Sequence, residues 1–174
     1  MMKSVNDLFL INCIEYLKVF PTEMDPLPEV LENRLSQGIT KISDCFLLQQ
    51  HVWKAPHVLE EVEKLSSPED KIFFELDHNE LCMLDYLLPH KSNNSKKEAS
   101  KALSYGVITS YRLARMLKPF GIFRIIHSFG YDLEDKLISS YISFYRVRAD
   151  QPDWVNNHRD EINGLMVITT ESGY

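Results

Sequence analysis

The tripeptide Pro119-Phe120-Gly121 is the strongest constraint that the sequence places on the fold. Proline cannot continue a helix, and glycine readily adopts the backbone angles that end one, so a helix has to end here. Before it, Leu113, Ala114 and Leu117 recur at helical spacing. After it, residues 120–129 are rich in Ile and Phe, as is typical of a β-strand. We therefore expect a helix, a tight stop and a strand in this order.

Residues 96–118, upstream of this stop, permit two interpretations. Tyr105-Gly106 can form a turn between two short helices, with Thr109 or Ser110 capping the second, as in a helix-turn-helix motif. Alternatively, one helix runs through the whole segment, and Gly106 costs it about 1 kcal/mol. Downstream, residues 133–147 repeat apolar side chains every three or four positions and are predicted to be helical. Residues 165–170 are predicted to form a strand that can pair with residues 122–128.

Residues 1–90 show helical periodicity and capping signals. At Ser67-Pro68-Glu69-Asp70, a cap, a first-turn proline and acidic residues mark a helix start, and this helix runs to Pro89 or breaks near 77–79. The polar segment 90–97 is the best domain boundary, which divides the chain into modules at 1–90 and 95–174. The other helices of the first module are expected at 5–20, 28–37, 41–54 and from Pro56 onward.

Charge is distributed unevenly along the chain. Residues 1–89 carry a net charge of -9, residues 90–124 carry +7 and the remainder -4, which gives -6 in total. A basic block inside an acidic chain is typical of phosphate binding, although the same side chains could form a solvated face or neutralise the acidic half. We assign nucleic-acid contacts to seven residues: Lys96, Lys97, Lys101, Arg112, Arg115, Lys118 and Arg124.

Other site chemistries find little support. His78 and Cys82 lie one helical turn apart, but further metal ligands are lacking, so no metal site is assigned. His158-Arg159-Asp160 matches a kinase tripeptide without the asparagine and glycine-rich loop of a kinase. We therefore expect no catalytic residues and no cofactor. The cysteines are far apart, and neither a membrane span nor a signal peptide is recognised, so we expect a cytoplasmic protein with reduced thiols.

Residues 108–145 resemble a known family. The segment Leu113-Ala114-Arg115-Met116-Leu117-Lys118-Pro119-Phe120-Gly121-Ile122 is followed by Gly130-Tyr131-Asp132-Leu133-Glu134-Asp135 and an aromatic end from Tyr141 to Tyr145. This combination is similar to the C-terminal domain of unknown function that ends many plasmid- and phage-encoded helicase/primase-type proteins. Its opening also looks like the first helix of a winged helix-turn-helix. The resemblance implies a winged-helix-like module and, because the ATP-binding parts are absent, no helicase or primase activity.

The sequence as a whole predicts a mainly helical α+β protein. Its N-terminal helical module packs on a small winged-helix-like module with a short β-sheet. The predicted function is non-enzymatic binding of DNA or RNA, in a regulatory or accessory role and of phage or plasmid origin. The alternative is an acidic protein-interaction module, such as an immunity or inhibitor protein that covers a basic nuclease. Neither function involves a membrane.

Overall fold

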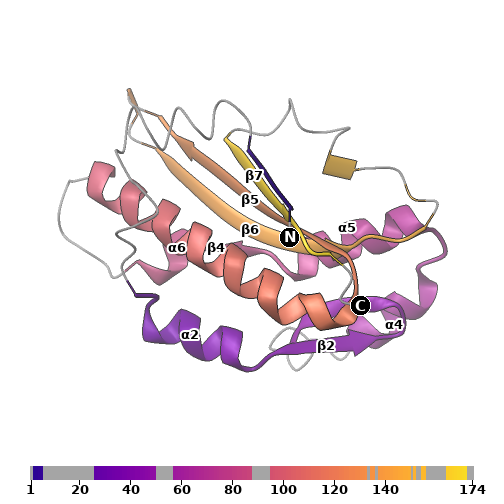
Figure 1. Cartoon of the computed structure of the whole chain (residues 1–174). Helices are drawn as coiled ribbons and strands as arrows, with labels where there is room; N and C mark the ends of the chain where they lie inside the picture. The colour runs from indigo at the N-terminus through magenta and orange to yellow at the C-terminus, as the bar shows by residue number, and fades with distance from the viewer. Residues whose placement is uncertain are drawn as a thin grey trace.

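A five-stranded antiparallel sheet forms the centre of the computed structural model (Figure 1). The structure describes residues 2–5, 26–49, 57–87, 95–132, 134–135, 137–149, 151, 154–155 and 164–171. The strands follow the order β1-β7-β5-β6-β4, so the N-terminal strand pairs with the C-terminal one. Their bounds are β1 Met2–Val5, β4 Leu81–Cys82, β5 Phe123–Tyr131, β6 Ile138–Arg146 and β7 Leu165–Thr169.

Helix α6, Ser95–Leu117, lies along one face of this sheet (Figure 1). Its 23 residues correspond to a length of about 34 Å. It passes into a short 3-10 turn, η3 Lys118–Phe120, and ends at Gly121, whose φ is 129°. The apolar side of α6 packs on alternate residues of three strands, which therefore share one face. This cluster includes Ala102, Leu103, Leu113, Leu117, Phe123, Ile125, Phe129, Ile142, Phe144, Met166 and Ile168.

A two-stranded sheet is built from the first half of the chain. Its hairpin turns at Ser43, which has a positive φ of 53°. Helices α4 and α5 pack on strand β3 through a cluster that contains Leu47, Val58 and Phe74. The elements of this half are α2 Glu29–Ser36, β2 Ile39–Ile42, β3 Cys45–Leu48, α4 His57–Lys64, α5 Pro68–His78 and η2 Met83–Tyr86.

Helix α5 also packs on the face of the large sheet that points away from α6. Ile72 of α5 is fully buried in a cluster with Ile126 of β5 and Tyr145 of β6. The large sheet is therefore a middle layer, with α6 on one side and α5 on the other. No helix in the described part of the chain is long and apolar enough to cross a membrane.

Several sequence predictions are confirmed. The helix expected at 28–37 is α2, and Gly38 follows it with a φ of 87°. The start at Ser67 is a capping box, in which Ser67 Oγ accepts the Asp70 N–H and the Asp70 carboxylate accepts the Ser67 N–H. The break near 77–79 is present because α5 ends at His78. The strand predicted at 165–170 is β7, and it pairs with residues 124–128 of β5.

Two segments that were predicted to be helical contain strands instead. Residues 41–54 include β3, and residues 133–147 include β6. Strand β6 buries Ile142 and Phe144 against α6 and Tyr145 on the opposite face, so apolar residues are present on both faces. When both faces of a strand are apolar, some apolar residues also fall three or four positions apart by chance. The β-branched and aromatic content of this segment suits a pleated, half-buried surface. Pairing with nine residues of β5 then decides the conformation.

The expectation of a mainly helical fold with a winged-helix-like module is therefore wrong; the chain is an α+β protein whose sheet is its central layer. Helix α6 continues through Gly106, so the described residues contain no helix-turn-helix at this point. Ser4 and Val5, expected to begin the first helix, lie in β1, and residues 6–20 lie outside the described part. The largest apolar cluster draws residues from both sides of the boundary expected at 90–95.

Helix α6 comes very close to the sheet at Gly106. A Cβ atom at this position would lie 2.2 Å from the Cε1 and Nε2 atoms of His127. Nε2 of His127 is 3.1 Å from Ser140 Oγ, and this hydroxyl donates to the Ala102 carbonyl at 3.3 Å. Burial lowers the pKa of His127 to about 3, so the ring is neutral at neutral pH. The glycine is therefore required for close helix–sheet contact.

We predict that Gly106→Ala destabilises the protein, although alanine is the better helix former. The change should improve helix propensity by about 1 kcal/mol, but the new methyl group forces a rearrangement that costs about 1–3 kcal/mol in a packed interior. Urea unfolding measures the difference. In a His127→Ala background the ring is gone, and the same substitution should become neutral or stabilising. A stabilising Gly106→Ala in the wild-type background would contradict this explanation.

Candidate functional site

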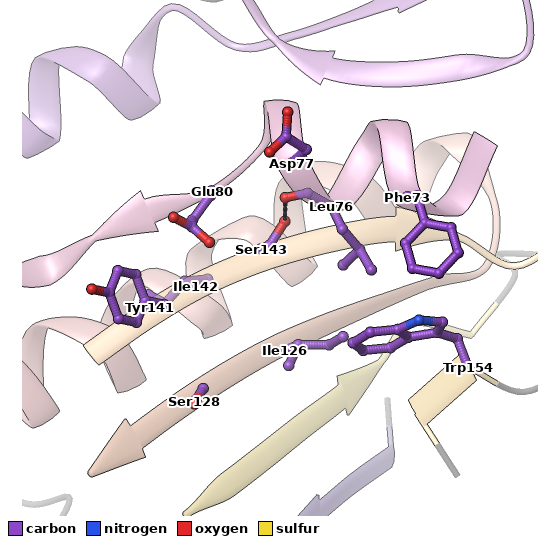
Figure 2. A pocket seen from close by; sticks show the side chains of 10 residues that line it. All are labelled: Phe73, Leu76, Asp77, Glu80, Ile126, Ser128, Tyr141, Ile142, Ser143 and Trp154. Carbon is purple, nitrogen blue, oxygen red and sulfur yellow. Dashed lines mark hydrogen bonds between the residues drawn. The ribbon is translucent and has the colours of Figure 1, made fainter. Parts of the chain in front are cut away.

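A cleft of about 410 Å³ opens on the sheet face that points away from α6 (Figure 2). Helix α5 and the residues after it form one wall, β5 and β6 form the floor, and Trp154 lies on the other side. Apolar side chains dominate the lining, which holds no Lys, Arg or His among the residues that the structure describes. The lining residues are Phe73, Leu76, Asp77, Glu80, Ile126, Ser128, Tyr141, Ile142, Ser143 and Trp154.

One end of the cleft is aromatic. Phe73 and Trp154 meet edge to face, with their ring centroids 6.4 Å apart and their planes at 90°. Although it touches Trp154, Phe73 keeps 48% of its surface exposed. Aromatic side chains combine a large apolar area with few rotatable bonds, so a half-exposed aromatic pair is typical of a contact surface.

The other end of the cleft is acidic, with Glu80 close to Tyr141 and Asp77 on the rim (Figure 2). Burial and then the charge of Asp77 raise the pKa of Glu80. The pKa of Tyr141 is also raised, first by Cys82, then by burial and by Glu80 and Asp85. Neighbouring negative charge contributes to both shifts, and a bound cation would oppose that part of them.

His78 lies next to Asp77. The carboxylate Oδ2 lies 3.7 Å from Nδ1 of His78. The same Nδ1 is 3.0 Å from the carbonyl oxygen of Phe74, which is the shorter contact. The His78 ring stacks on Phe74, with the centroids 4.1 Å apart, so it is held on α5 and does not line the cleft.

The position of α5 over the sheet is set by Glu75, whose side chain is fully buried. Its Oε1 accepts the backbone N–H of Phe46 on β3 at 2.8 Å. Its Oε2 accepts the backbone N–H of Arg146 on β6 at 2.9 Å. One carboxylate therefore joins the edges of two separate sheets.

Asn79 makes the same connection one helical turn later. It accepts the backbone N–H of Leu48 at 2.9 Å and donates to the carbonyls of Phe46 at 2.8 Å and Phe144 at 3.3 Å. Glu75 and Asn79 thus satisfy polar backbone groups that another strand would otherwise pair. They occupy the place of a strand between β3 and β6.

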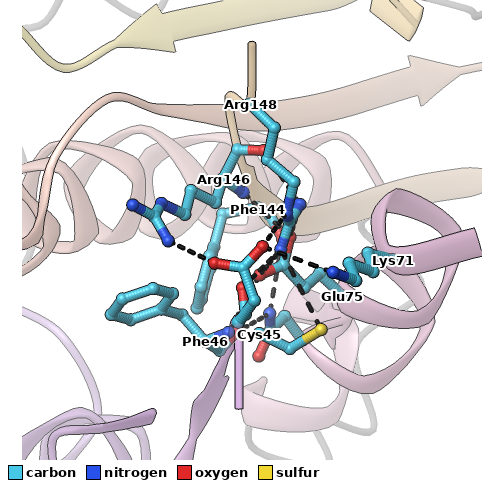
Figure 3. A network of polar contacts seen from close by, with 9 residues as sticks. Cys45, Phe46, Lys71, Glu75, Phe144, Arg146 and Arg148 are labelled. Atoms are coloured by element: carbon cyan, nitrogen blue, oxygen red, sulfur yellow. Dashed lines mark hydrogen bonds and ion pairs between the residues drawn. The ribbon is translucent and has the colours of Figure 1, made fainter. Parts of the chain in front are cut away.

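Arg148 neutralises the buried carboxylate (Figure 3). Its Nη1 and Nη2 donate to the two oxygens of Glu75 at 2.9 and 3.0 Å, and its Nε donates to Asp44 at 3.0 Å. Burial raises the pKa of Glu75, while the Arg148 pairing opposes the rise. Burial would also raise the pKa of Asp44, but Arg148 outweighs it and the pKa is lowered. Burial and the Glu75 charge raise the pKa of Cys45 to about 11, so this thiol stays protonated.

Four of the basic residues assigned to nucleic acid form one stripe on the outer side of α6. At 3.6 residues per turn, Lys97, Lys101, Arg112 and Arg115 project within one sector of the helix, opposite the buried side. Lys96 lies exposed in the first turn of the helix. Lys118 is exposed in η3, just beyond the other end.

The contacts and positions of some of these basic residues argue against a single basic surface. Arg112 forms an ion pair with Glu32 of α2, and Lys101 lines a hollow of about 350 Å³ together with Glu29 and Glu98. Arg124 belongs to β5 and, by alternation, lies on the sheet face away from α6. Part of the basic block therefore neutralises the acidic first half, which is one of the alternatives that the charge distribution allowed.

The acidic–aromatic cleft was not predicted from the sequence. Phe73, Asp77 and Glu80 recur at intervals of four and three residues, and this spacing could have indicated a common side of α5 and the residues just after it. Trp154 comes from a distant segment, and no local pattern places it beside Phe73. Among the residues that the structure describes, no group of three His, Cys, Asp or Glu side chains could hold a metal ion. His158 lies outside them.

We predict that Arg148→Met destabilises the protein by about 3–5 kcal/mol, because it leaves the Glu75 carboxylate buried without its charged partner. Lys71→Met is the matched control. Lys71 contacts Asp44 at 3.5 Å in a partly exposed pair, so its loss should cost less than about 1 kcal/mol. Urea unfolding of both variants measures the difference. Equal costs would show that the buried pair does not hold α5 in place.

Known proteins give no indication of the function, so a functional argument has to start from the site. No family model, no curated protein and no solved structure matches the chain. The resemblance to the C-terminal domain of helicase/primase-type proteins therefore stays a prediction.

Proposed function

We propose that the chain is a protein-interaction module that binds a basic protein through the acidic–aromatic cleft. The observation that carries this proposal is the cleft itself. It combines a half-exposed aromatic pair, an apolar floor and two carboxylates, and none of the described residues that line it is basic. A dry apolar centre with a charged rim is the usual anatomy of a protein–protein interface.

The half of the chain that supplies one wall of the cleft is acidic. Helices α4 and α5 and the residues that follow carry exposed acidic side chains, and residues 1–89 have a net charge of -9. Charge of one sign around a contact surface speeds association with a partner of the opposite sign and orients it. The exposed acidic residues are Glu60, Glu61, Glu63, Glu69, Asp70, Asp77, Glu80 and Asp85.

An inhibitory role suits this combination. A protein that blocks a basic nuclease needs an acidic surface to meet the groove that normally binds phosphate, and an apolar anchor to slow dissociation. The cleft supplies the anchor through Phe73 and Trp154 and the charge through Asp77 and Glu80. We therefore propose a partner of the nuclease type, with this chain as its inhibitor or immunity protein.

We predict that Asp77→Lys with Glu80→Lys abolishes capture of a basic protein partner from extracts of the native host, because the rim then repels the partner. Mass spectrometry identifies the captured protein and gives its charge. Glu29→Lys with Glu134→Lys is the control, since it changes the net charge equally on exposed residues outside the cleft lining. Equal capture by both variants, or capture of acidic proteins only, would reject the proposal.

A second candidate function, binding of DNA or RNA, is favoured by the outer stripe of α6. Lys97 and Arg115 lie on one side of the same helix, about 27 Å apart along its axis, so an extended polyanion could contact both ends. This binding would use a different surface from the cleft, and the two functions are separable by substitution.

If α6 binds nucleic acid, Lys97→Ala with Arg115→Ala should lower the affinity for mixed-sequence DNA and RNA. The slope of log affinity against log salt should also fall by roughly one for each lost phosphate contact. Lys64→Ala on α4 is the control, because this lysine is exposed on another helix. A salt slope that the double substitution leaves unchanged would rule out this surface.

A further inference from the structure

The two ends of the cleft favour different chemical groups of one ligand. Leu76, Ile126 and Ser143 lie between the aromatic pair at one end and Glu80 with Tyr141 at the other (Figure 2). The Ser143 hydroxyl donates to the Leu76 carbonyl at 2.6 Å, so it is already satisfied and leaves the middle effectively apolar. A ligand that fills the whole cleft therefore needs an apolar stem and a positively charged head.

Among the residues that the structure describes, none that lines the cleft is basic, and His78, which lies 3.7 Å from Asp77, is outside the lining. Asp77 and Glu80 are close enough for the Asp77 charge to act on Glu80. Like charges so placed repel each other, and a cation from outside relieves this repulsion. Tyr141 stands beside Glu80 and offers an aromatic face to the same cation (Figure 2).

Long basic side chains have the required shape. Lysine and arginine bury their methylene groups along apolar surface and extend the charged group beyond it. The aromatic pair at one end would cover the stem, and the carboxylates at the other end would receive the head. A free inorganic cation would use only the acidic end and would leave the apolar floor and the aromatic pair without a contact.

We propose that the cleft is an anchor site for an arginine side chain presented by the partner protein. This inference rests on the proposed function, since the arginine belongs to the basic protein. Arginine is favoured over lysine for two reasons. Its guanidinium group is planar and stacks on aromatic rings, and its several N–H groups can reach two carboxylates at once.

Short peptides test the inference without the partner. In a Trp53→Phe background, Trp154 becomes the only tryptophan, because the chain contains two, and its fluorescence reports on the cleft. The ligands are three blocked tripeptides, acetyl-Gly-X-Gly-amide, in which X is arginine, lysine or citrulline. Citrulline keeps the shape of arginine but carries no charge. The arginine peptide should bind saturably, with a dissociation constant on the order of millimolar for so small a ligand.

The arginine peptide should bind at least roughly tenfold more tightly than the citrulline peptide and also more tightly than the lysine peptide. Asp77→Asn with Glu80→Gln should remove this preference, whereas Glu29→Gln should retain it. Asp77 and Glu80 are both exposed, so their substitution should leave the fold intact, as circular dichroism can check. Equal binding of the three peptides, a preference for lysine, or no saturable binding would overturn the arginine assignment.

This result is separable from the proposed function. If partner capture is lost in Asp77→Lys with Glu80→Lys but the arginine peptide does not bind, the cleft is an interface with a different anchor. If neither experiment responds to these substitutions, the cleft is not the interaction surface at all.

Discussion

The buried carboxylate of Glu75 is the interaction on which the architecture depends. It accepts backbone hydrogen bonds from β3 and β6 and a bidentate pair from Arg148. Moving a carboxylate out of water is costly and is offset only when good hydrogen bonds and an opposite charge meet it. Because both conditions hold here, the Glu75 carboxylate fits one particular arrangement of β3, α5 and β6. A shift of any of these elements would leave a charged or polar group buried without a partner.

Helix α5 and the two residues after it serve both structure and recognition. Glu75 and Asn79 point into the protein and join the two sheets, while Phe73, Asp77 and Glu80 line the cleft. The wall of the cleft is therefore attached to a helix that buried hydrogen bonds hold to both sheets. A surface that is rigid before binding loses little conformational entropy when a partner arrives, which favours a small anchor site of this kind.

Features decided within a few residues were predictable from the sequence, and features decided by distant contacts were not. The capping box at Ser67 and the stop at Gly121 depend on neighbouring residues, and both are present. Strand β6 has apolar residues on both faces, so only its pairing with β5 distinguishes it from a helix. The basic residues were visible as a block, but the Glu32 partner of Arg112 lies 80 positions away. The cleft needed Trp154 beside Phe73, which no local pattern indicates.

The pairing of Glu75 with Arg148 has a consequence for how the chain is made. The two residues are 73 positions apart, and Asp44 is 104 positions from the same arginine. On the ribosome, helix α5 emerges with its carboxylate long before the guanidinium that neutralises it has been synthesised. Closing such long loops is slow, and strand edges stay open in the meantime. The junction of the two sheets is therefore completed late in biogenesis, and a chain truncated before Arg148 leaves the Glu75 carboxylate without the arginine that neutralises it.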